Sequence, residues 1–169
     1  VPKDLRKSAY SDFPLPIGSG QTISQPTTVA FMLELLQPRK GNKILDIGAG
    51  SGWLTALLAE IVGQAGFVLG YEIDRMVGKF GKDNLSKTNL SNYEYRIEDV
   101  KKIFKKNLFF DRIIASAAFP DIPNELIDML KDGGIMVVPS QDNNLIKISK
   151  IKSKIAKETY RGFIFVPMR

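Results

Sequence analysis

The stretch Lys43-Ile44-Leu45-Asp46-Ile47-Gly48-Ala49-Gly50-Ser51-Gly52 decides the fold of this chain. Its first half is a short apolar run typical of a buried strand, and its second half contains three glycines. Glycines directly after a strand let the backbone turn sharply into a helix and approach a ligand closely. Taken alone, the same pattern also fits an ordinary turn between a strand and a helix, so the surrounding sequence has to decide.

The segments after this stretch alternate between strand and helix patterns. Predicted strands cover residues 43–47, 67–72, 93–97, 110–115 and 135–139, and predicted helices cover residues 27–36, 53–61, 75–85 and 123–130. The alternation predicts a doubly wound α/β fold with a mostly parallel, Rossmann-like sheet.

The two ends of the chain have different patterns. Residues 11–26 are rich in Pro, Gly and Ser and predict an irregular entry segment. Residues 145–151 and 158–166 predict two strands with no helix between them, and therefore an antiparallel hairpin on the sheet. We expect residues 1–169 to form a single domain.

The composition excludes several classes of protein. The chain has 169 residues, of which 44% are hydrophobic and 25% are charged, as in ordinary globular proteins. No apolar run approaches the ~18 residues that span a bilayer, so we expect no membrane association. The chain has no Cys, which fits a cytoplasmic location. It has no His, so hydrolases of the Ser-His or Cys-His type are excluded and no metal site is expected.

The net charge of +6 raises the question of a nucleic-acid partner. The lysines concentrate only mildly, at residues 101–106 and 147–157. Aromatic residues do not alternate with them as base-stacking platforms require. We therefore interpret the charge as a solvated basic surface and expect no nucleic-acid partner.

The residues around the glycines indicate which cofactor binds. Glu72 ends the strand at 67–72, where a carboxylate can accept hydrogen bonds from both ribose hydroxyls of a nucleoside. The glycine spacing G-x-G-x-G is tighter than the G-x-G-x-x-G of dinucleotide-binding folds, and Asp46 stands directly before it. S-adenosyl-L-methionine has no phosphate and carries an ammonium group that a carboxylate can accept. The pattern therefore favours S-adenosyl-L-methionine over NAD.

The Asp46–Gly52 pattern resembles the first motif of class I S-adenosylmethionine-dependent methyltransferases. Four further segments are similar to the protein-L-isoaspartate O-methyltransferase family. They are Pro14-Leu15-Pro16-Ile17-Gly18-Ser19-Gly20-Gln21-Thr22-Ile23-Ser24-Gln25-Pro26, Ala117-Ala118-Phe119-Pro120-Asp121-Ile122-Pro123, Leu130-Lys131-Asp132-Gly133-Gly134 and Phe165-Val166-Pro167-Met168-Arg169. The resemblance extends over the whole chain.

This resemblance implies a protein repair enzyme. Its members transfer the methyl group of S-adenosyl-L-methionine to the free carboxylate of L-isoaspartyl residues in damaged proteins and peptides, leaving S-adenosyl-L-homocysteine. A carboxylate is already an anion at neutral pH, so the transfer needs no general base, which fits the absence of His. Catalysis then consists of aligning the acceptor oxygen, the methyl carbon and the sulfur, and of excluding water.

The resemblance also assigns site residues. It places Ser24 at the active-site position, where we expect its hydroxyl to hold the substrate carboxylate, and it makes Thr22, Gly20 and Ala118 candidates for substrate binding. The candidates for cofactor binding are Asp46, Gly48, Gly50, Ser51, Gly52, Glu72, Ile73, Glu98 and Asp99. The residues alone leave another explanation open: Thr22 and Ser24 cap the helix that begins near Pro26.

The chain departs from the family in three places. Many members carry Gly-Asp-Gly where this chain has Glu98-Asp99-Val100, and His or Tyr where it has Thr27. Members also begin with additional helices, and we expect these to be absent ahead of the substrate-loop segment at residues 1–26. Two alternatives therefore stay open: a methyltransferase of tRNA or another nucleic acid, and a divergent cofactor-binding paralogue without repair activity. We expect the chain to be a cytoplasmic monomer.

Overall fold

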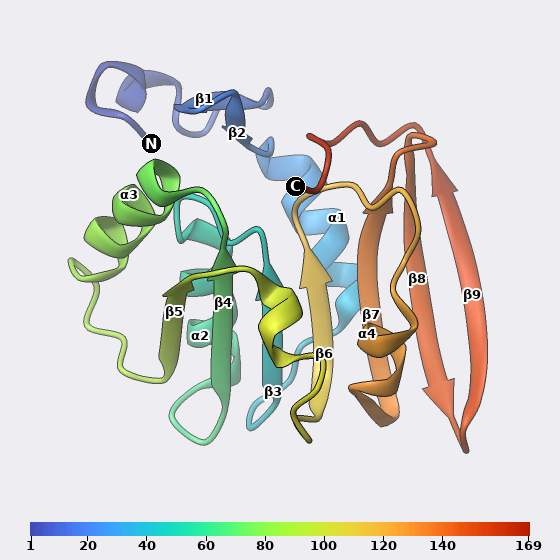
Figure 1. Cartoon of the computed structure of the whole chain (residues 1–169). Helices are drawn as coiled ribbons and strands as arrows, with labels where there is room; N and C mark the ends of the chain where they lie inside the picture. The colour runs from blue at the N-terminus through green and yellow to red at the C-terminus, as the bar shows by residue number, and fades with distance from the viewer.

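A seven-stranded sheet forms the centre of the computed structural model, which describes all residues from 1 to 169 (Figure 1). The strand order is β5-β4-β3-β6-β7-β8-β9. The parallel strands are β3 (Lys43–Ile47), β4 (Phe67–Glu72), β5 (Tyr93–Ile97), β6 (Phe110–Ala115) and β7 (Leu130–Ser140). The strands β8 (Asn144–Ile151) and β9 (Lys154–Arg161) extend the sheet with antiparallel pairing.

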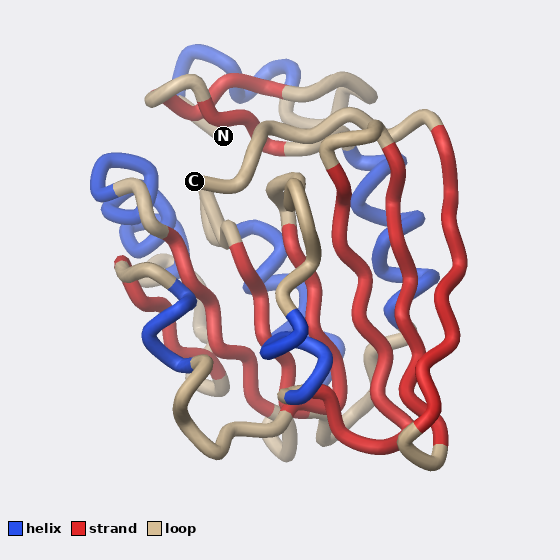
Figure 2. Tube along the Cα trace, turned by 45° about the vertical axis from the view of Figure 1, so that its right-hand side comes forward, coloured by secondary structure: helices blue, strands red, loops and turns tan.

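Helices cover both faces of this sheet (Figure 2). One layer contains α1 (Pro26–Leu36), α2 (Trp53–Val62) and α3 (Arg75–Leu85), and the other contains η2 (Val100–Ile103) and α4 (Asn124–Asp128). Along β3, Ile44 packs in the cluster with α1 and α2, whereas Leu45 and Ile47 pack in the cluster with η2 and α4. A strand buried on both faces explains the continuous apolar run in the sequence. The predicted doubly wound, mostly parallel sheet is confirmed.

The strand order reverses at β3, because β4 and β5 continue to one side of it and β6 and β7 to the other. Such a switch point leaves a crevice at the carboxyl ends of the strands. Figure 1 shows the hairpin of β1 (Leu15–Gly18) and β2 (Gln21–Ile23) lying across this end of the sheet. The segment Val166–Met168 crosses it as well and is anchored by two 2.8 Å backbone hydrogen bonds with Ala118. Two segments remote in sequence therefore cover the crevice.

The prediction of an irregular entry segment is wrong, because β1 and β2 form an antiparallel hairpin and η1 (Lys3–Ser8) precedes it. The turn between the strands contains Gly18, Ser19 and Gly20, with φ values of 98°, 52° and 71°. Glycine reaches this left-handed region without steric cost, so the Gly-Ser-Gly run marks a tight turn here. The strands on either side are too short to show a clear alternation.

The prediction of a strand at residues 158–166 is wrong in position, because β9 covers Lys154–Arg161. The turn that precedes β9 contains Lys152 and Ser153, with φ values of 48° and 62°. Two-residue turns of this kind are usually signalled by Asn-Gly or Asp-Gly, and Lys-Ser gives no such signal. The predicted antiparallel hairpin itself is confirmed.

Two further differences lie around β7. The helix predicted at residues 123–130 is shorter, because Leu130 already pairs with Phe110 as the first residue of β7. Gly133 and Gly134 lie within β7, at a shift of its register against β6, and do not separate it from the helix. The strand predicted at 135–139 therefore begins five residues too late, and the remaining predicted helices and strands agree with the structure to within one residue. None of the helices is long and apolar enough to cross a lipid bilayer.

Candidate active site

A cleft lies at the carboxyl ends of the parallel strands, beneath the β1–β2 hairpin. Seven of the residues predicted from the sequence line it: Thr22, Gly48, Gly50, Glu72, Ile73, Glu98 and Asp99. They come from β2, from the loop after β3, and from the ends of β4 and β5. The structure therefore brings these residues into one site, although they are spread from residue 22 to residue 99.

The glycine loop, residues 48–52, is held in place by residues of β4 and β5. Gly48 and Gly50 have φ values of 69° and 54°, which only glycine adopts readily. The carbonyl of Tyr71 accepts hydrogen bonds from the N–H groups of Gly48 and Ala49, at 2.8 and 2.9 Å. The hydroxyl of Tyr95 donates to the carbonyl of Gly50 at 2.6 Å. The loop is thus a preformed edge of the cleft.

Four of the five N–H groups of this loop, residues 48–52, are already used inside the protein. Those of Gly48 and Ala49 bond to Tyr71, that of Gly50 donates to the Glu72 carboxylate at 3.0 Å, and that of Gly52 donates to Ala49 at 2.9 Å. A loop that cradles a pyrophosphate needs free N–H groups directed at the ligand. The loop therefore fits a phosphate-free nucleoside better than a dinucleotide.

Glu72 is the only buried acidic residue among those that line the cleft. Its side chain is almost buried, its Oε2 atom accepts from Gly50, and its Oε1 atom accepts from the N–H of Asp74 at 2.9 Å. These two bonds fix the orientation of the carboxylate. Each carboxylate oxygen keeps a further lone pair, so Glu72 can still accept from the hydroxyls of a ribose.

Glu98 and Asp99 lie at the opposite end of the cleft, beside η2. The Oδ1 atom of Asp99 accepts from the N–H of Lys101 at 2.9 Å and caps this short helix. Its other carboxylate oxygen forms no hydrogen bond within the protein, so it is available to a donor such as the amino group of adenine. Lys101 lines the same end of the cleft.

Asp46 lies beneath the glycine loop and does not line the cleft. Its carboxylate is fully buried on the α2 side of β3, where Oδ2 accepts from the Thr55 hydroxyl at 2.6 Å and Oδ1 has no partner. Burial, with a smaller contribution from the nearby charge of Glu72, raises the pKa of Asp46 to about 7. The structure thus places Asp46 as a support of the loop, away from the position expected for a ligand of the ammonium group.

We expect Asp46 to make the stability of the protein depend on pH. Its folded-state pKa lies above the unfolded value, so between about pH 4 and pH 7 the native state binds more protons than the unfolded state. The free energy of unfolding should therefore fall as pH rises through this window, by up to ~1.4 kcal/mol per pH unit from this group. Urea unfolding of the wild type and of Asp46→Asn across the window measures the difference. If the free energy of unfolding changes equally with pH in both proteins, the pKa of Asp46 is not raised in the folded state.

Ser24 and Thr22 lie beside the glycine loop. They line a small recess together with Ser116 and the loop residues 48–51. Thr22 and Ser116 line both this recess and the cleft, so the two spaces adjoin. The hydroxyl-bearing residues predicted for substrate binding therefore lie directly beside the predicted cofactor loop.

The explanation of Thr22 and Ser24 as helix caps is wrong. The N-cap residue of α1 is Gln25, and no side-chain hydrogen bond caps the helix at that position. The carboxylate of Asp12 instead accepts from the N–H of Thr27 at 3.0 Å, in the first turn. The hydroxyls of Thr22 and Ser24 are therefore not used to start the helix.

Besides Asp46 and Ser24, four predicted residues lie outside the lining of the cleft. Ala118 is buried, and its N–H and carbonyl both pair with the segment Val166–Met168. Ser51 and Gly52 fasten the loop to its surroundings: the Ser51 carbonyl accepts from Asn84 of α3 at 3.0 Å, and Gly52 is the N-cap of α2. Gly20 lies in the turn of the β1–β2 hairpin.

Sequence reasoning missed several residues of the cleft. They are Ile17, Gln21, Asp74, Lys101, Ser116, Ala117, Phe119 and the segment Val166–Arg169. The resemblance of 117–123 and 165–169 to one family is a signal for part of this set. The position of Val166–Arg169 at the cleft depends on the pairing of Ala118 with Pro167, which no local pattern predicts.

A family model for protein-L-isoaspartate(D-aspartate) O-methyltransferases matches residues 1–169. The chain belongs to this family. Among relatives in the family, the protein-L-isoaspartate O-methyltransferase of Methanopyrus kandleri is 40% identical over 99% of this chain and 76% of its own length. That of Petrotoga mobilis is 43% identical over 99% of this chain and 80% of its own length.

The fold of the chain matches a solved protein-L-isoaspartate O-methyltransferase from Plasmodium falciparum, which was determined in complex with S-adenosyl-L-homocysteine. The two structures superpose with a TM-score of 0.86 and 25% identity, over 95% of this chain and 81% of the other. The predicted family, the predicted enzyme class and the predicted fold are confirmed.

Proposed function

We propose that this chain transfers the methyl group of S-adenosyl-L-methionine to the free carboxylate of L-isoaspartyl residues in damaged proteins and peptides, and releases S-adenosyl-L-homocysteine. One observation carries the proposal: the recess with Ser24 and Thr22 adjoins the cleft, and the two spaces share Gly48 and Gly50 of the glycine loop as lining. Both partners of a methyl transfer thereby have binding groups beside one fixed element.

The cleft residues fit S-adenosyl-L-methionine. Glu72 is oriented to accept from the ribose hydroxyls, and Glu98 and Asp99 offer acceptors for an adenine amino group. Four of the five N–H groups of the loop at 48–52 already have acceptors within the protein, so few donors remain that would select a phosphate-bearing cofactor. The uncharged side chains of Ile17, Ile73 and Phe119 complete the lining.

The chain's own residues have to bind the two substrates, orient them towards each other and exclude water from the site. When bound, S-adenosyl-L-methionine supplies a methyl group that its sulfonium already activates. The hydroxyls of Ser24 and Thr22 donate hydrogen bonds to the substrate carboxylate and direct one of its oxygens towards the cleft. No residue needs to remove a proton, because the carboxylate is an anion at neutral pH. Ile17, Phe119 and Val166 limit the access of water to the cleft.

We further propose that residues 1–169 act as a single domain, as a monomer, in the cytoplasm and without a nucleic-acid partner. The absence of Cys fits a reducing compartment. The two packed clusters of the core share one sheet, which supports folding as one unit. The distribution of lysines supports the proposal that nucleic acid is not a partner, because aromatic residues do not alternate with them.

Transfer of a labelled methyl group separates the possible functions. Repair activity requires labelling of an isoaspartyl peptide and no labelling of the same peptide with normal aspartate. Labelling of bulk tRNA instead would favour the nucleic-acid methyltransferase. Calorimetric binding of S-adenosyl-L-homocysteine with no turnover on any acceptor would favour a cofactor-binding paralogue without repair activity.

We expect Ser24→Ala to lower kcat/KM for an isoaspartyl peptide by about 10- to 100-fold, because one oriented donor to the reacting carboxylate is lost. The affinity for S-adenosyl-L-homocysteine should stay within about twofold, since Ser24 lines the recess and not the cleft. Steady-state kinetics and calorimetry measure the two effects. Ser91→Ala, at an exposed serine outside both spaces, is the control. A collapse of cofactor affinity in Ser24→Ala would make Ser24 a structural residue.

A further inference from the structure

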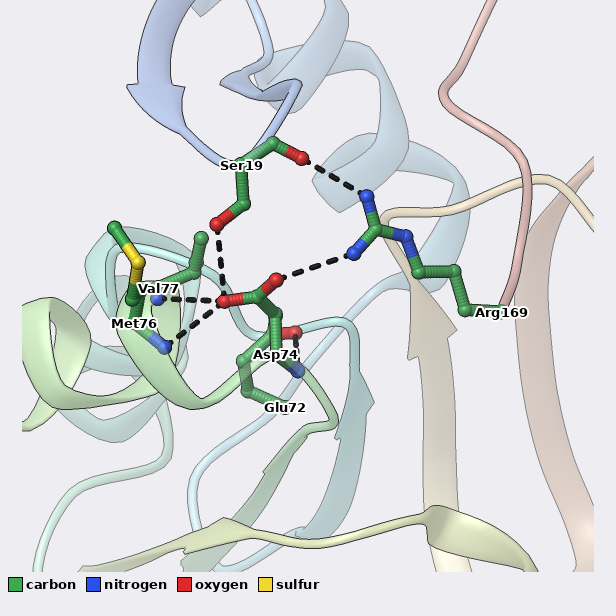
Figure 3. A network of polar contacts seen from close by, with 6 residues as sticks. All are labelled: Ser19, Glu72, Asp74, Met76, Val77 and Arg169. Atoms are coloured by element: carbon green, nitrogen blue, oxygen red, sulfur yellow. Dashed lines mark hydrogen bonds and ion pairs between the residues drawn. The ribbon is translucent and has the colours of Figure 1, made fainter.

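Arg169 connects three segments above the cleft (Figure 3). Its Nη1 atom forms an ion pair with Oδ2 of Asp74 at 3.1 Å, and its Nη2 atom donates to the carbonyl of Ser19 at 2.9 Å. The hydroxyl of Ser19 donates to Oδ1 of Asp74 at 3.2 Å. The turn of the β1–β2 hairpin, the start of α3 and the segment Val166–Arg169 thus meet in one closed network, which we call the Arg169 network.

Asp74 holds a fixed position in this network. Its Oδ1 atom caps α3 by accepting from the N–H groups of Met76 and Val77, at 2.9 and 3.0 Å. The Val77 N–H contributes most to lowering the pKa of Asp74, so the carboxylate is charged at neutral pH. The N–H of Asp74 itself donates to Glu72, the acidic group of the cleft. The guanidinium of Arg169 is therefore linked to Glu72 through a single residue.

The hairpin depends on this network for its polar attachment. Ser19 makes the only hydrogen bonds that join residues 15–23 to the rest of the protein, one to Asp74 and one from Arg169. The hairpin also carries Ile17, which lines the cleft beside Gly50, and Thr22, which lines cleft and recess. A weaker network would let this cover move away from the glycine loop.

We propose that Arg169 is a positioning residue that latches the β1–β2 hairpin over the cofactor cleft through Asp74. The inference rests on the proposed function, since it concerns the retention of S-adenosyl-L-methionine and of its product. With the network closed, Ile17 and Val166–Arg169 cover the cleft and Thr22 is held beside the loop. Release of S-adenosyl-L-homocysteine requires the network to open.

The size of the effect follows from the geometry. Exposed ion pairs contribute little, because two flexible side chains have to be ordered in water. Here the Asp74 side chain is only 15% exposed and is already ordered by the helix cap, and the fork of Arg169 reaches two acceptors. We expect loss of the pair to speed dissociation of S-adenosyl-L-homocysteine about three- to tenfold.

The test is the dissociation rate of S-adenosyl-L-homocysteine from the full chain, followed by stopped-flow fluorescence of Trp53. Trp53 is the only tryptophan and begins α2 beside the glycine loop. Arg169→Met and Asp74→Asn should both show the faster rate, because Asn keeps the cap acceptor but loses the charge. The double variant should be no faster than either single variant, since both remove the same interaction. Added salt should speed release from the wild type and much less from the variants.

Lys147→Met is the matched control. It breaks the Lys147–Glu158 pair, which has a similar distance of 3.0 Å and a similar exposure but joins β8 to β9 away from the cleft. The dissociation rate of S-adenosyl-L-homocysteine from Lys147→Met should equal that from the wild type. In Arg169→Met, the KM for S-adenosyl-L-methionine should rise, with kcat unchanged or higher. Wild-type rates in Arg169→Met and Asp74→Asn would overturn the latch. A wild-type chain that does not bind S-adenosyl-L-homocysteine would instead overturn the proposed function.

Discussion

Gly81→Ala is expected to abolish measurable binding of S-adenosyl-L-homocysteine and to lower the free energy of unfolding by about 2–4 kcal/mol. A Cβ atom at position 81 would clash with the carbonyl oxygen of Gly50 and would lie 2.5 Å from the hydroxyl of Tyr95. Neither group can move aside without cost, because the Gly50 carbonyl is backbone and the Tyr95 hydroxyl donates a hydrogen bond to it. Helix α3 would have to move away from the glycine loop.

Gly81→Ala should disturb the cleft by displacing the glycine loop. Tyr95 donates to Gly50 at 2.6 Å, and the N–H of Gly50 in turn donates to Glu72. Displacing Gly50 therefore disturbs both the edge of the cleft and the carboxylate expected to accept from the ribose. A β-carbon would otherwise favour a helix, since Ala has the higher helix propensity, so a loss of stability here reports the contact and not the helix.

Calorimetry with S-adenosyl-L-homocysteine and urea unfolding measure the two effects of Gly81→Ala. Gly133→Ala is the control, because Gly133 has a φ of 76° and nothing within 4 Å of the added Cβ atom, and it lies in β7 away from the cleft. It should cost about 1 kcal/mol of stability from backbone strain and leave cofactor affinity unchanged. Wild-type affinity in Gly81→Ala would show that the loop does not depend on its contact with α3.

The centre of the fold is predictable from local sequence because its determinants are local. The apolar run of β3 ends directly in the glycines, and Glu72 ends the next parallel strand, so the topology alone brings them to one edge of the sheet. The strand and helix pattern is therefore sufficient to place Gly48, Gly50 and Glu72 in one site. The apolar periodicity of α1 and α3 likewise determines which side each helix buries.

Other features depend on contacts between distant residues. Asp46 belongs to a strand buried on both faces, so the sequence does not tell which way its side chain points or that it meets Thr55. Tyr95 and Gly50 are 45 positions apart, and Arg169 and Asp74 are 95 apart. Each of these pairs forms only once the strands and the chain end are arranged in space, and no local pattern signals it.

Glu72→Gln is expected to weaken binding of S-adenosyl-L-homocysteine by about 100-fold or more, through both the loop and the ligand. Each carboxylate oxygen accepts from a backbone N–H, Oε2 from Gly50 and Oε1 from Asp74. An amide has only one acceptor oxygen, so in either orientation its NH₂ group faces a backbone N–H. One of the two bonds is lost in a nearly buried place, which should lower the free energy of unfolding by about 1–3 kcal/mol.

The same change separates loop support from ligand binding when it is compared with Glu72→Asp. Asp keeps both acceptor oxygens but is shorter by one methylene, so it should keep one of the two backbone bonds and lose affinity less than Gln does. Glu158→Gln is the control, since Glu158 also accepts hydrogen bonds but lies on β9. Calorimetry and urea unfolding of all three variants give the result. If Glu72→Gln binds S-adenosyl-L-homocysteine within about threefold of the wild type, Glu72 neither orders the loop nor accepts from the ribose, and the cofactor has to bind elsewhere in the cleft.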